Sequence, residues 1–469
     1  MTLAALPDTP RSIKPKPSPK PGATTALKQD KVATVRGVKK HVATFEDLNA
    51  RFALLDQDGS PSVYVSRRDF LPIQDADLRR RLAGEVVATG QKDGKPTYTD
   101  AFTFWTGHAA RHVYRRVAFT SKPVTDDTLN LFRGLGVKPR PGKCERIINH
   151  VQEVICSGDV NAGDAMLKLL AWQIQNIGKP SRVVVVLKSK KQQAGKGILL
   201  GELMAKIYGP SGFTAAATDQ ILGRFNSAIR GRAFIFLDEV LFAGDRKSAD
   251  GIKSLSTATV IGIEEKGLPI VQCPIAVNLW LASNHENAAH IEEDDARYWA
   301  LDVSPHRVGD TAYFSELTQE IENGGREAFA HHLLNMDVSD FVPARDVPKD
   351  NETKANMVRA SVNPFDARKW LEDCCNANRV IGAKNPDAGE WTEWVEGERH
   401  SFGALMAAYS EWQKTVKSPV APLPTPSGNL GEVLGKAGLT EAPRTKFGRG
   451  RILPNADTCK ANIWRRDDN

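Results

Sequence analysis

The sequence predicts an α/β protein with a mostly parallel β-sheet at its centre, a mixed or helical part before it and a second part after it. Three apolar runs carry this prediction: RVVVVLK at 182–188, RAFIFLDE at 232–239 and IAVNLWLASN at 275–284. Continuous β-branched and apolar runs are typical of strands buried on both faces. Helical patterns separate the runs, and strands separated by helices pair in parallel.

Length and composition fit this class. The chain has 469 residues, which at roughly 150 residues per domain suggests two to four domains. Charged residues make up 25% and hydrophobic residues 41%, as in globular proteins. No apolar run reaches about 18 residues and the N-terminus lacks a signal-peptide pattern, so we expect a soluble cytoplasmic protein with no membrane contact. Six scattered cysteines without a CxxC pair predict neither a disulfide framework nor a zinc cluster.

Patterning along the chain predicts five segments. Residues 1–40 hold nine Lys and Arg against two Asp, a surplus that equals the whole net charge of +7. This disordered basic tail is either a non-specific phosphate-binding arm or a solubilising segment. The other four segments are a mixed α/β domain at 41–143, a helical linker domain at 144–180, the central α/β domain at 181–340 and a C-terminal domain at 341–469.

The part before the central domain begins with a short helix and two strands, in FEDLNARFALLDQDGSPSVYVSRRDF at 45–70. Asp56 and Asp58 lie between the strands. Such a pair binds metal in some polymerase sites, but beside Gly59 it is far more often a turn. Further on, the apolar positions of 144–178 recur at helical spacing and predict two helices.

A candidate phosphate-binding loop follows the first buried strand, in SKKQQAGKG at 189–197. Such a loop needs backbone N–H groups around the phosphate, a Lys that reaches its oxygens and a helix that begins at the anion. Gly195 and Lys196 stand where this geometry requires them, within the predicted nucleotide-binding stretch Ala194–Ile198. The match to G-x-x-x-x-G-K-[ST] is imperfect, because Lys190 replaces the first Gly and Gly197 replaces Ser or Thr. A Lys-rich surface loop is the alternative.

Polar residues end the next two predicted strands. Asp238 and Glu239 follow FIFL, where one carboxylate holds Mg²⁺ and the next polarises the attacking water. An acidic surface pair is the alternative, and the preceding loop makes it the weaker one. Asn284 ends the third strand, and a polar residue there, between the first two strands, contacts the γ-phosphate or attacking water; alone, it would more often be a cap or turn residue.

Two basic residues in the same region have functional and structural interpretations. Arg297 stands in the acidic stretch HIEEDDARYW before a further strand. It either stabilises phosphoryl-transfer charge in a neighbouring subunit or pairs locally with Asp294 or Asp295. Lys266 lies at the tip of a predicted hairpin, between VIGIEE and PIVQCPI, where a turn Lys is usually only a solvated side chain.

The C-terminal part combines helices with a basic end. Helix SFGALMAAYSEWQKTV, a Pro-rich linker and helix GNLGEVLGKAGL precede RTKFGRGRIL. Within 400–466 this order suits a winged helix that contacts duplex DNA through Arg444, Lys446, Arg449 and Arg451. A basic turn on a helical bundle is the alternative.

The order of these motifs resembles superfamily 3 helicases of the AAA+ class, in particular the phage primase–helicase branch. The motifs that carry the resemblance, over about 41–305, are AGKG, Phe225-Asn226, FIFLDE, IKSLSTATVIGIEEKG, LWLASN and DDARYWALDV. The phrases FEDLNARFALL, FTFWTGH and ERIINHVQEVICSGD also look like this branch. Ala296 departs from it, because many relatives have a second Arg there.

The resemblance implies roles for the motif residues. Lys196 would be the Walker A lysine, Asp238 and Glu239 the Walker B pair, Asn284 the sensor and Arg297 the arginine finger. Lys266 would lie on a hairpin that grips DNA in a central channel. The family forms hexameric rings that bind ATP and Mg²⁺ between subunits and translocate 3′ to 5′ on single-stranded DNA.

The resemblance therefore predicts an ATP-dependent DNA helicase, a homo-hexamer on single-stranded and forked DNA in the replication of a phage or mobile element. Its location would be the cytoplasm of a bacterial host. A primase or polymerase would be a separate protein, since residues 41–180 lack that catalytic pattern. One rival is a non-hydrolysing origin-binding or loader protein whose loop has lost turnover. A weaker rival is a DNA-packaging ATPase.

Overall fold

The computed structural model describes residues 32–238, 246–284, 290–292, 295–384, 391–418, 430–446 and 448–465. The chain divides into two compact units. The first holds the residues up to Arg116 with two short later pieces, Thr125–Leu129 and Gly267–Pro269, and the second holds the remainder. Within the described residues, no helix is long and apolar enough to cross a membrane. The predicted disordered tail at 1–40 is wrong for its last part, because residues 32–40 lie in strand β1 (Val32–Val35) and strand β2 (Val38–Val42), which pair with each other and with a later strand. The other segment boundaries remain predictions.

The first unit contains two four-stranded sheets, with strand orders β1-β2-β6-β7 and β5-β4-β3-β8. Its elements are β1 (Val32–Val35), β2 (Val38–Val42), α1 (Phe45–Arg51), β3 (Phe52–Leu55), β4 (Val63–Ser66), β5 (Pro72–Ile73), α2 (Asp75–Leu82), β6 (Glu85–Lys92), β7 (Lys95–Asp100), α3 (Ala101–Gly107) and β8 (Val113–Tyr114). The helix and two strands predicted at the start of this unit are confirmed as α1, β3 and β4. Leu48, Leu78 and Trp105 are fully buried in its core.

The loop between β3 and β4 is held by local contacts of Asp56. Asp56 accepts a hydrogen bond from the Ser62 hydroxyl at 2.6 Å and forms an ion pair with Arg115. Among the described residues, no group of three or more His, Cys, Asp or Glu side chains is arranged to hold a metal ion. The contacts of Asp56 therefore fit the turn interpretation.

The second unit is built around a five-stranded sheet, and every neighbouring pair in it is parallel. Its strands, in spatial order, are β12 (Gly212–Ala215), β13 (Phe234–Asp238), β16 (Asn278–Ser283), β11 (Val184–Lys188) and β17 (Tyr298–Asp302). The side chains of β11, and those of β13 before its last residue, are buried, as expected for strands covered on both faces. The three predicted strands and the predicted parallel sheet are confirmed.

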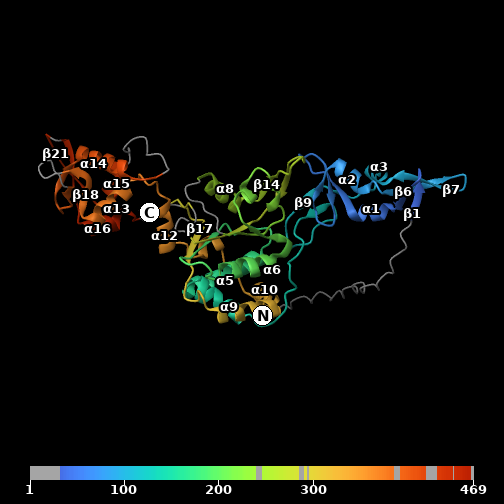
Figure 1. Ribbon diagram of the computed structural model, residues 1–469, viewed down its shortest axis with the longest axis horizontal. Coiled ribbons are helices and arrows are strands. Elements are labelled where there is room, and N and C mark those ends of the chain that lie inside the picture. The colour runs from blue at the N-terminus through green and yellow to red at the C-terminus, as the bar shows by residue number, and fades with distance from the viewer. Residues whose placement is uncertain are drawn as a thin grey trace, which may run out of the picture. The chain divides into compact units, whose positions relative to one another are not determined.

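Helices and a hairpin surround this sheet. Before it come α4 (Glu145–Asn149), the π-helical turn η1 (His150–Ile155) and α5 (Val160–Gln175); β9 (Arg116–Ala118) and β10 (Thr128–Asn130) form a separate pair. Between its strands lie η2 (Ile198–Ala205), α6 (Lys206–Tyr208), η3 (Gly209–Ser211), α7 (Asp219–Leu222), η4 (Ser227–Ile229), α8 (Arg246–Thr257) and the hairpin β14 (Val260–Ile263) and β15 (Val271–Pro274). After it follow α9 (Thr311–Glu320), η5 (Ile321–Gly325), α10 (Arg326–Asn335), α11 (Pro343–Asp346) and α12 (Glu352–Ser361). Figure 1 shows α5, α6 and α10 on one side of the sheet and α8 with the hairpin on the other.

The C-terminal part has its own hydrophobic core. Its elements are α13 (Ala367–Ala377), β18 (Arg379–Lys384), β19 (Trp391–Glu393), β20 (Arg399–Ser401), α14 (Phe402–Thr415), α15 (Leu430–Lys436), β21 (Thr440–Thr445), β22 (Gly448–Ile452) and α16 (Ala456–Ile463). Trp370, Tyr409 and Leu434 are fully buried in this core. The predicted helices are present as α14 and α15, and the basic segment forms an antiparallel sheet of order β20-β22-β21. The sequence did not predict α16.

Candidate active site

The carboxyl ends of three neighbouring strands create the candidate site. β16 lies between β11 and β13, as the sequence predicted for the strand that ends in Asn284. Because the three strands are parallel, the loop after β11, the end of β13 and the end of β16 meet at one edge of the sheet. Ligands of open α/β sheets bind at this edge. Lys196, Asp238 and Asn284 all line one cavity there, with a volume of about 1180 Å³.

The loop between β11 and η2 has a backbone that depends on Gly195. Gly195 has φ +94°, a conformation that favours glycine. A Cβ added at Gly195 would lie 2.4 Å from Cε1 of His150, so a larger residue has no space there. Gly197 differs, because its φ is −64° and a Cβ there would meet no atom within 4 Å. The structure therefore has space for the hydroxyl residue that the Walker A pattern places at position 197.

The Lys196 ammonium donates to three oxygen atoms at the carboxyl edge of the sheet. Its side chain points inward, and the residue is only 8% exposed. Nζ donates to Oδ1 of Asn284 at 2.7 Å, to the carbonyl oxygen of Ser283 at 3.1 Å and to the hydroxyl of Ser189. The Ser189 hydroxyl also donates to Oδ1 of Asn284 at 3.0 Å. These three oxygens hold the ammonium at the end of β16, beside the cavity.

Asp238 is the described acidic residue of the predicted Walker B pair. It ends β13 with an exposed side chain beside the same cavity. Glu239 lies outside the described residues. With one described carboxylate at this point, a Mg²⁺ ion would complete its shell with phosphate oxygens and water, which is how Mg²⁺ usually binds in nucleotide sites. The donor set fits a nucleotide-bound Mg²⁺ better than a metal held by protein alone.

His150, which was not among the predicted site residues, contacts the loop at Gly195. His150 is 2% exposed, and burial lowers its pKa to about 4, so the ring is neutral at pH 7. Nε2 lies 3.3 Å from the carbonyl oxygen of Gly195, and Nδ1 lies 3.0 Å from the Tyr313 hydroxyl. Both ring nitrogens are hydrogen-bonded if the neutral ring carries its proton on Nε2: Nε2–H then donates to the carbonyl oxygen of Gly195, and Nδ1 accepts from the Tyr313 hydroxyl. His150 shares a helix face with the apolar residues Ile147 and Val154. A His on an apolar helix face was the one sequence feature that could have indicated its burial beside the loop.

Arg297 lies at the opposite edge of the sheet from Lys196. It directly precedes β17, whereas the loop with Lys196 follows β11, and the two strands are parallel neighbours. A five-residue strand is about 16 Å long. Within one chain the structure therefore does not bring Arg297 to the cavity.

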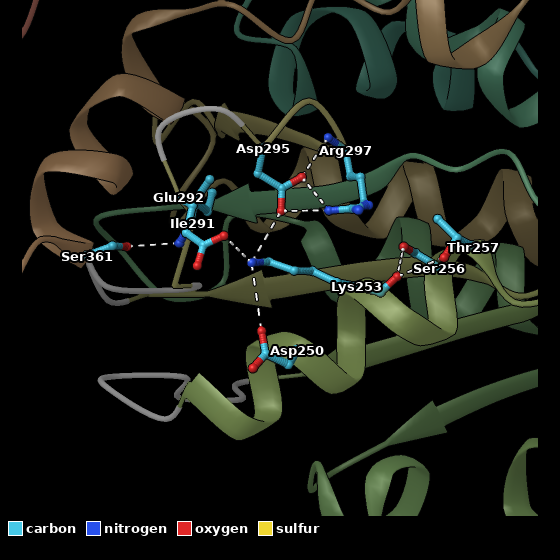
Figure 2. A network of polar contacts seen from close by, with 9 residues as sticks. All are labelled: Asp250, Lys253, Ser256, Thr257, Ile291, Glu292, Asp295, Arg297 and Ser361. Atoms are coloured by element: carbon cyan, nitrogen blue, oxygen red, sulfur yellow. Dashed lines mark hydrogen bonds and ion pairs between the residues drawn. The ribbon is translucent and has the colours of Figure 1, made fainter.

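Arg297 forms the local salt bridge that the sequence left open as an alternative. Nη1 lies 3.2 Å and 3.1 Å from the two carboxylate oxygens of Asp295. Figure 2 shows this pair, with Lys253 of α8 approaching the same carboxylate from the other side. Asp294 lies outside the described residues.

Lys266 is exposed at the tip of the β14–β15 hairpin. Asn226 holds this hairpin from the segment before β13: its Nδ2 donates to the carbonyl oxygen of Gly262 at 3.0 Å, and its Oδ1 accepts from the N–H of Glu264 at 2.8 Å. Arg230 adds an ion pair with Glu265 at 3.0 Å. Phe225-Asn226 was a motif of the resemblance without an assigned role, and the structure gives Asn226 a role as a clamp.

The four basic residues of the C-terminal end differ in environment. Arg444, Lys446 and Arg449 are exposed around the β21–β22 hairpin. The Arg451 side chain is 15% exposed and points inward. Its guanidinium donates to the carbonyl oxygens of Leu439 and Gly431 at 3.1 and 3.2 Å. These bonds give Arg451 a structural role between α15 and β22.

Comparisons with known proteins agree with this fold. Residues 187–297 match the model of a family of unknown function, DUF5906, and this range includes the candidate phosphate-binding loop, the hairpin and Arg297. The apo structure of the NrS-1 C-terminal region is similar, with a TM-score of 0.58, 18% identity, and coverage of 87% of this chain and 96% of that one. A second apo structure of the same region, the A form, gives a TM-score of 0.57 and 16% identity, with 87% and 97% coverage.

These similarities are at identities that show a shared fold alone. A JCV helicase structure also matches, but its TM-score of 0.29, 15% identity and coverage of 50% of this chain carry no argument. No curated protein matches the sequence.

Proposed function

We propose that the chain is an ATP-dependent DNA helicase of superfamily 3, with an AAA+ core, that acts in replication of a phage or mobile element in a bacterial cytoplasm. The observation that supports it best is the meeting of Lys196, Asp238 and Asn284 at one edge of a parallel sheet. Phosphate recognition needs a cation, a magnesium ligand and a polar group that senses the γ-phosphate or water. The three residues supply one of each.

The residues at this edge divide the work of phosphoryl transfer. Lys196 would turn from its present oxygen partners to phosphate oxygens and stabilise their charge, while the N–H groups of Ala194–Ile198 would surround the phosphates. Asp238 would hold Mg²⁺, which supplies charge neutralisation. Glu239 would orient the attacking water, and Asn284, already bonded to Lys196, would contact that water or the γ-phosphate. Hydrolysis then depends on positioning and electrostatics.

The position of Arg297 favours a site shared by two subunits. In its own chain it lies a strand's length from the cavity, so it can complete only the site of a neighbour. Arginine fingers act in this way, in trans on phosphoryl charge. A homo-hexameric ring in which each subunit presents its carboxyl edge to the Arg297 side of the next satisfies this geometry.

DNA contacts follow from the exposed basic residues. Lys266 at the hairpin tip would grip phosphates of single-stranded DNA in the channel. The part from α14 to α16 would act as a winged helix, with Arg444, Lys446 and Arg449 on duplex phosphates at a fork. A separate primase or polymerase would complete the replication machinery.

ATP hydrolysis with and without single-stranded DNA tests this function. We expect DNA-stimulated turnover that falls about 100-fold or more in Lys196→Ala, since the ammonium stabilises transition-state charge. Lys191→Ala is the matched control, because Lys191 is an exposed lysine of the same loop. If Lys196→Ala still unwinds DNA, the assignment is wrong.

Two features of the loop favour a second candidate, a non-hydrolysing origin-binding or loader protein. Gln193 has φ +59° where a glycine would be relaxed, and Gly197 offers no hydroxyl to a metal. A folded wild-type protein that binds DNA equally with and without ATP, and shows no turnover, would support this candidate.

A further inference from the structure

Asp295 is an almost fully buried carboxylate between two cations from different elements. Its side chain is 2% exposed, with Arg297 on one side and Lys253 on the other. A buried carboxylate is costly unless it is paired. Figure 2 shows the arrangement: Asp295 lies between the guanidinium that precedes β17 and the ammonium that comes from α8.

The contacts to Arg297 fix both its main chain and its side chain. The Arg297 N–H donates to Oδ1 of Asp295 at 3.0 Å, and Nη1 contacts both carboxylate oxygens. The guanidinium is thus held from one side by a buried acceptor. Its side chain remains 40% exposed, so the other side is open to a further anion.

The contacts to Lys253 lead away from Arg297 to the hairpin. Lys253 is 14% exposed, and its Nζ lies 3.8 Å from Oδ2 of Asp295 and 2.6 Å from Oε2 of Glu292. It belongs to α8, which ends at Thr257, and β14 starts at Val260. A displacement of α8 therefore moves a cation at the carboxylate that holds Arg297.

We propose that Asp295 is the positioning residue of Arg297 and that Lys253 couples this position to α8 and the β14–β15 hairpin. The inference rests on the proposed function, in which Arg297 acts on the nucleotide of a neighbouring subunit. Asp295 sets the direction of the guanidinium before that neighbour binds, and the two cations share its charge. When α8 moves Lys253, the grip on Arg297 changes.

Mixed rings test the first half of the proposal. Arg297→Ala subunits keep Lys196 but lack the finger, and Lys196→Ala subunits keep the finger but lack the nucleotide lysine. Mixing the two variants should restore ATP turnover, because some interfaces then combine both residues. Asp295→Asn is next placed in one partner at a time: in the Lys196→Ala subunit, which donates the finger, or in the Arg297→Ala subunit, which does not.

We expect the restored turnover to fall at least fivefold more when Asp295→Asn is in the finger donor than when it is in the other subunit. A folding defect would lower turnover equally in both arrangements. If the two losses are equal, the inference about Asp295 is wrong. The proposed function still stands in that case, provided that mixing Lys196→Ala with Arg297→Ala restores turnover. Failure of the parental pair overturns the shared site and the inference with it. Asp250→Asn in the donor is the control: Asp250 contacts Lys253 at 3.9 Å but not Arg297, and its side chain is 73% exposed.

A separate measurement tests the coupling through Lys253. Lys253→Met keeps the length of the side chain and removes its charge, so the carboxylate loses its connection to α8. We expect the stimulation of ATP turnover by single-stranded DNA to fall at least threefold, with a smaller change in turnover without DNA. Stimulation equal to that of the wild type would overturn the coupling through Lys253. Thermal unfolding of each variant checks that the chains compared are folded.

Discussion

The two edges of the central sheet hold their cations in different surroundings. At the carboxyl edge, Lys196 donates to an amide oxygen, a carbonyl and a hydroxyl and lines a cavity. At the amino edge, Arg297 is paired with the buried carboxylate of Asp295. A cation that lines a cavity lies where a phosphate can reach it, whereas a buried carboxylate fixes the direction of a guanidinium. In the proposed function, the first edge binds the phosphates within one chain, and the second orients its arginine for the site of another chain.

The largest expected effect separates the roles of the two edges. Arg297→Ala should lower ATP turnover by about 100-fold or more, since arginine fingers contribute mainly in the transition state. Nucleotide affinity should change little, whereas Lys196→Ala should weaken binding as well. Equilibrium binding of a fluorescent ATP analogue, measured beside turnover, distinguishes the two variants. If Arg297→Ala loses nucleotide affinity as strongly as Lys196→Ala, the two edges do not have separate roles in nucleotide binding and turnover.

His150 should make the free energy of unfolding depend on pH. Burial lowers its pKa from 6.5 to about 4, so the unfolded chain binds this proton first as the pH falls. The free energy of unfolding should therefore be unaffected by His150 above pH 6.5 and fall between pH 6.5 and 4, by up to about 3 kcal/mol. Urea unfolding at pH 7, 6 and 5 measures the slope. In His150→Gln the decrease of the free energy of unfolding between pH 6.5 and 4 should be smaller by this amount. An unchanged pH dependence would show that His150 is not its source.

Gly195→Ala should disturb the loop, and Gly197→Ala should not. The first places a Cβ against His150 at a positive φ, with an expected loss of about 2 kcal/mol in unfolding free energy and weaker nucleotide binding. The second has space and an ordinary φ. Thermal unfolding and ATP-analogue affinity of the two variants provide the comparison. Equal effects would show that the close approach of His150 to Gly195 is unimportant.

The smallest effect concerns the C-terminal hairpin. Arg451→Ala should lower stability by about 1 kcal/mol, because it removes bonds to two backbone carbonyls. Arg449→Ala should leave stability within about 0.5 kcal/mol, since its side chain is exposed. DNA affinity should show the reverse order. A loss of DNA affinity in Arg451→Ala without a loss of stability would contradict this reading of the contacts.

The carboxyl edge of the sheet could be predicted from the sequence for a clear reason. Buried parallel strands have a strong local pattern, and their carboxyl ends share one edge, so Lys196, Asp238 and Asn284 were expected to meet. The hairpin of Lys266 was likewise visible as two apolar runs around a polar turn. These predictions needed only local pattern and the rules of parallel sheets.

Other parts of the site depend on long-range contacts that no local pattern encodes. His150 meets Gly195 across 45 positions, and Lys253 meets Asp295 across a further chain segment that includes the hairpin. The choice of Asp295 as the partner of Arg297 depends on which carboxylate is buried. Arg451 looked like its neighbours in the basic segment until packing placed it inside. Burial and partner choice are properties of the assembled fold.

The most direct test of the account is the restoration of turnover in mixtures of Lys196→Ala and Arg297→Ala subunits at constant total concentration. Each variant alone should hydrolyse ATP at a small fraction of the wild-type rate. If the two edges of the sheet form one site between subunits, turnover should rise on mixing and be highest near equal amounts. Turnover that stays at the average of the two separate variants at every ratio would contradict the shared site.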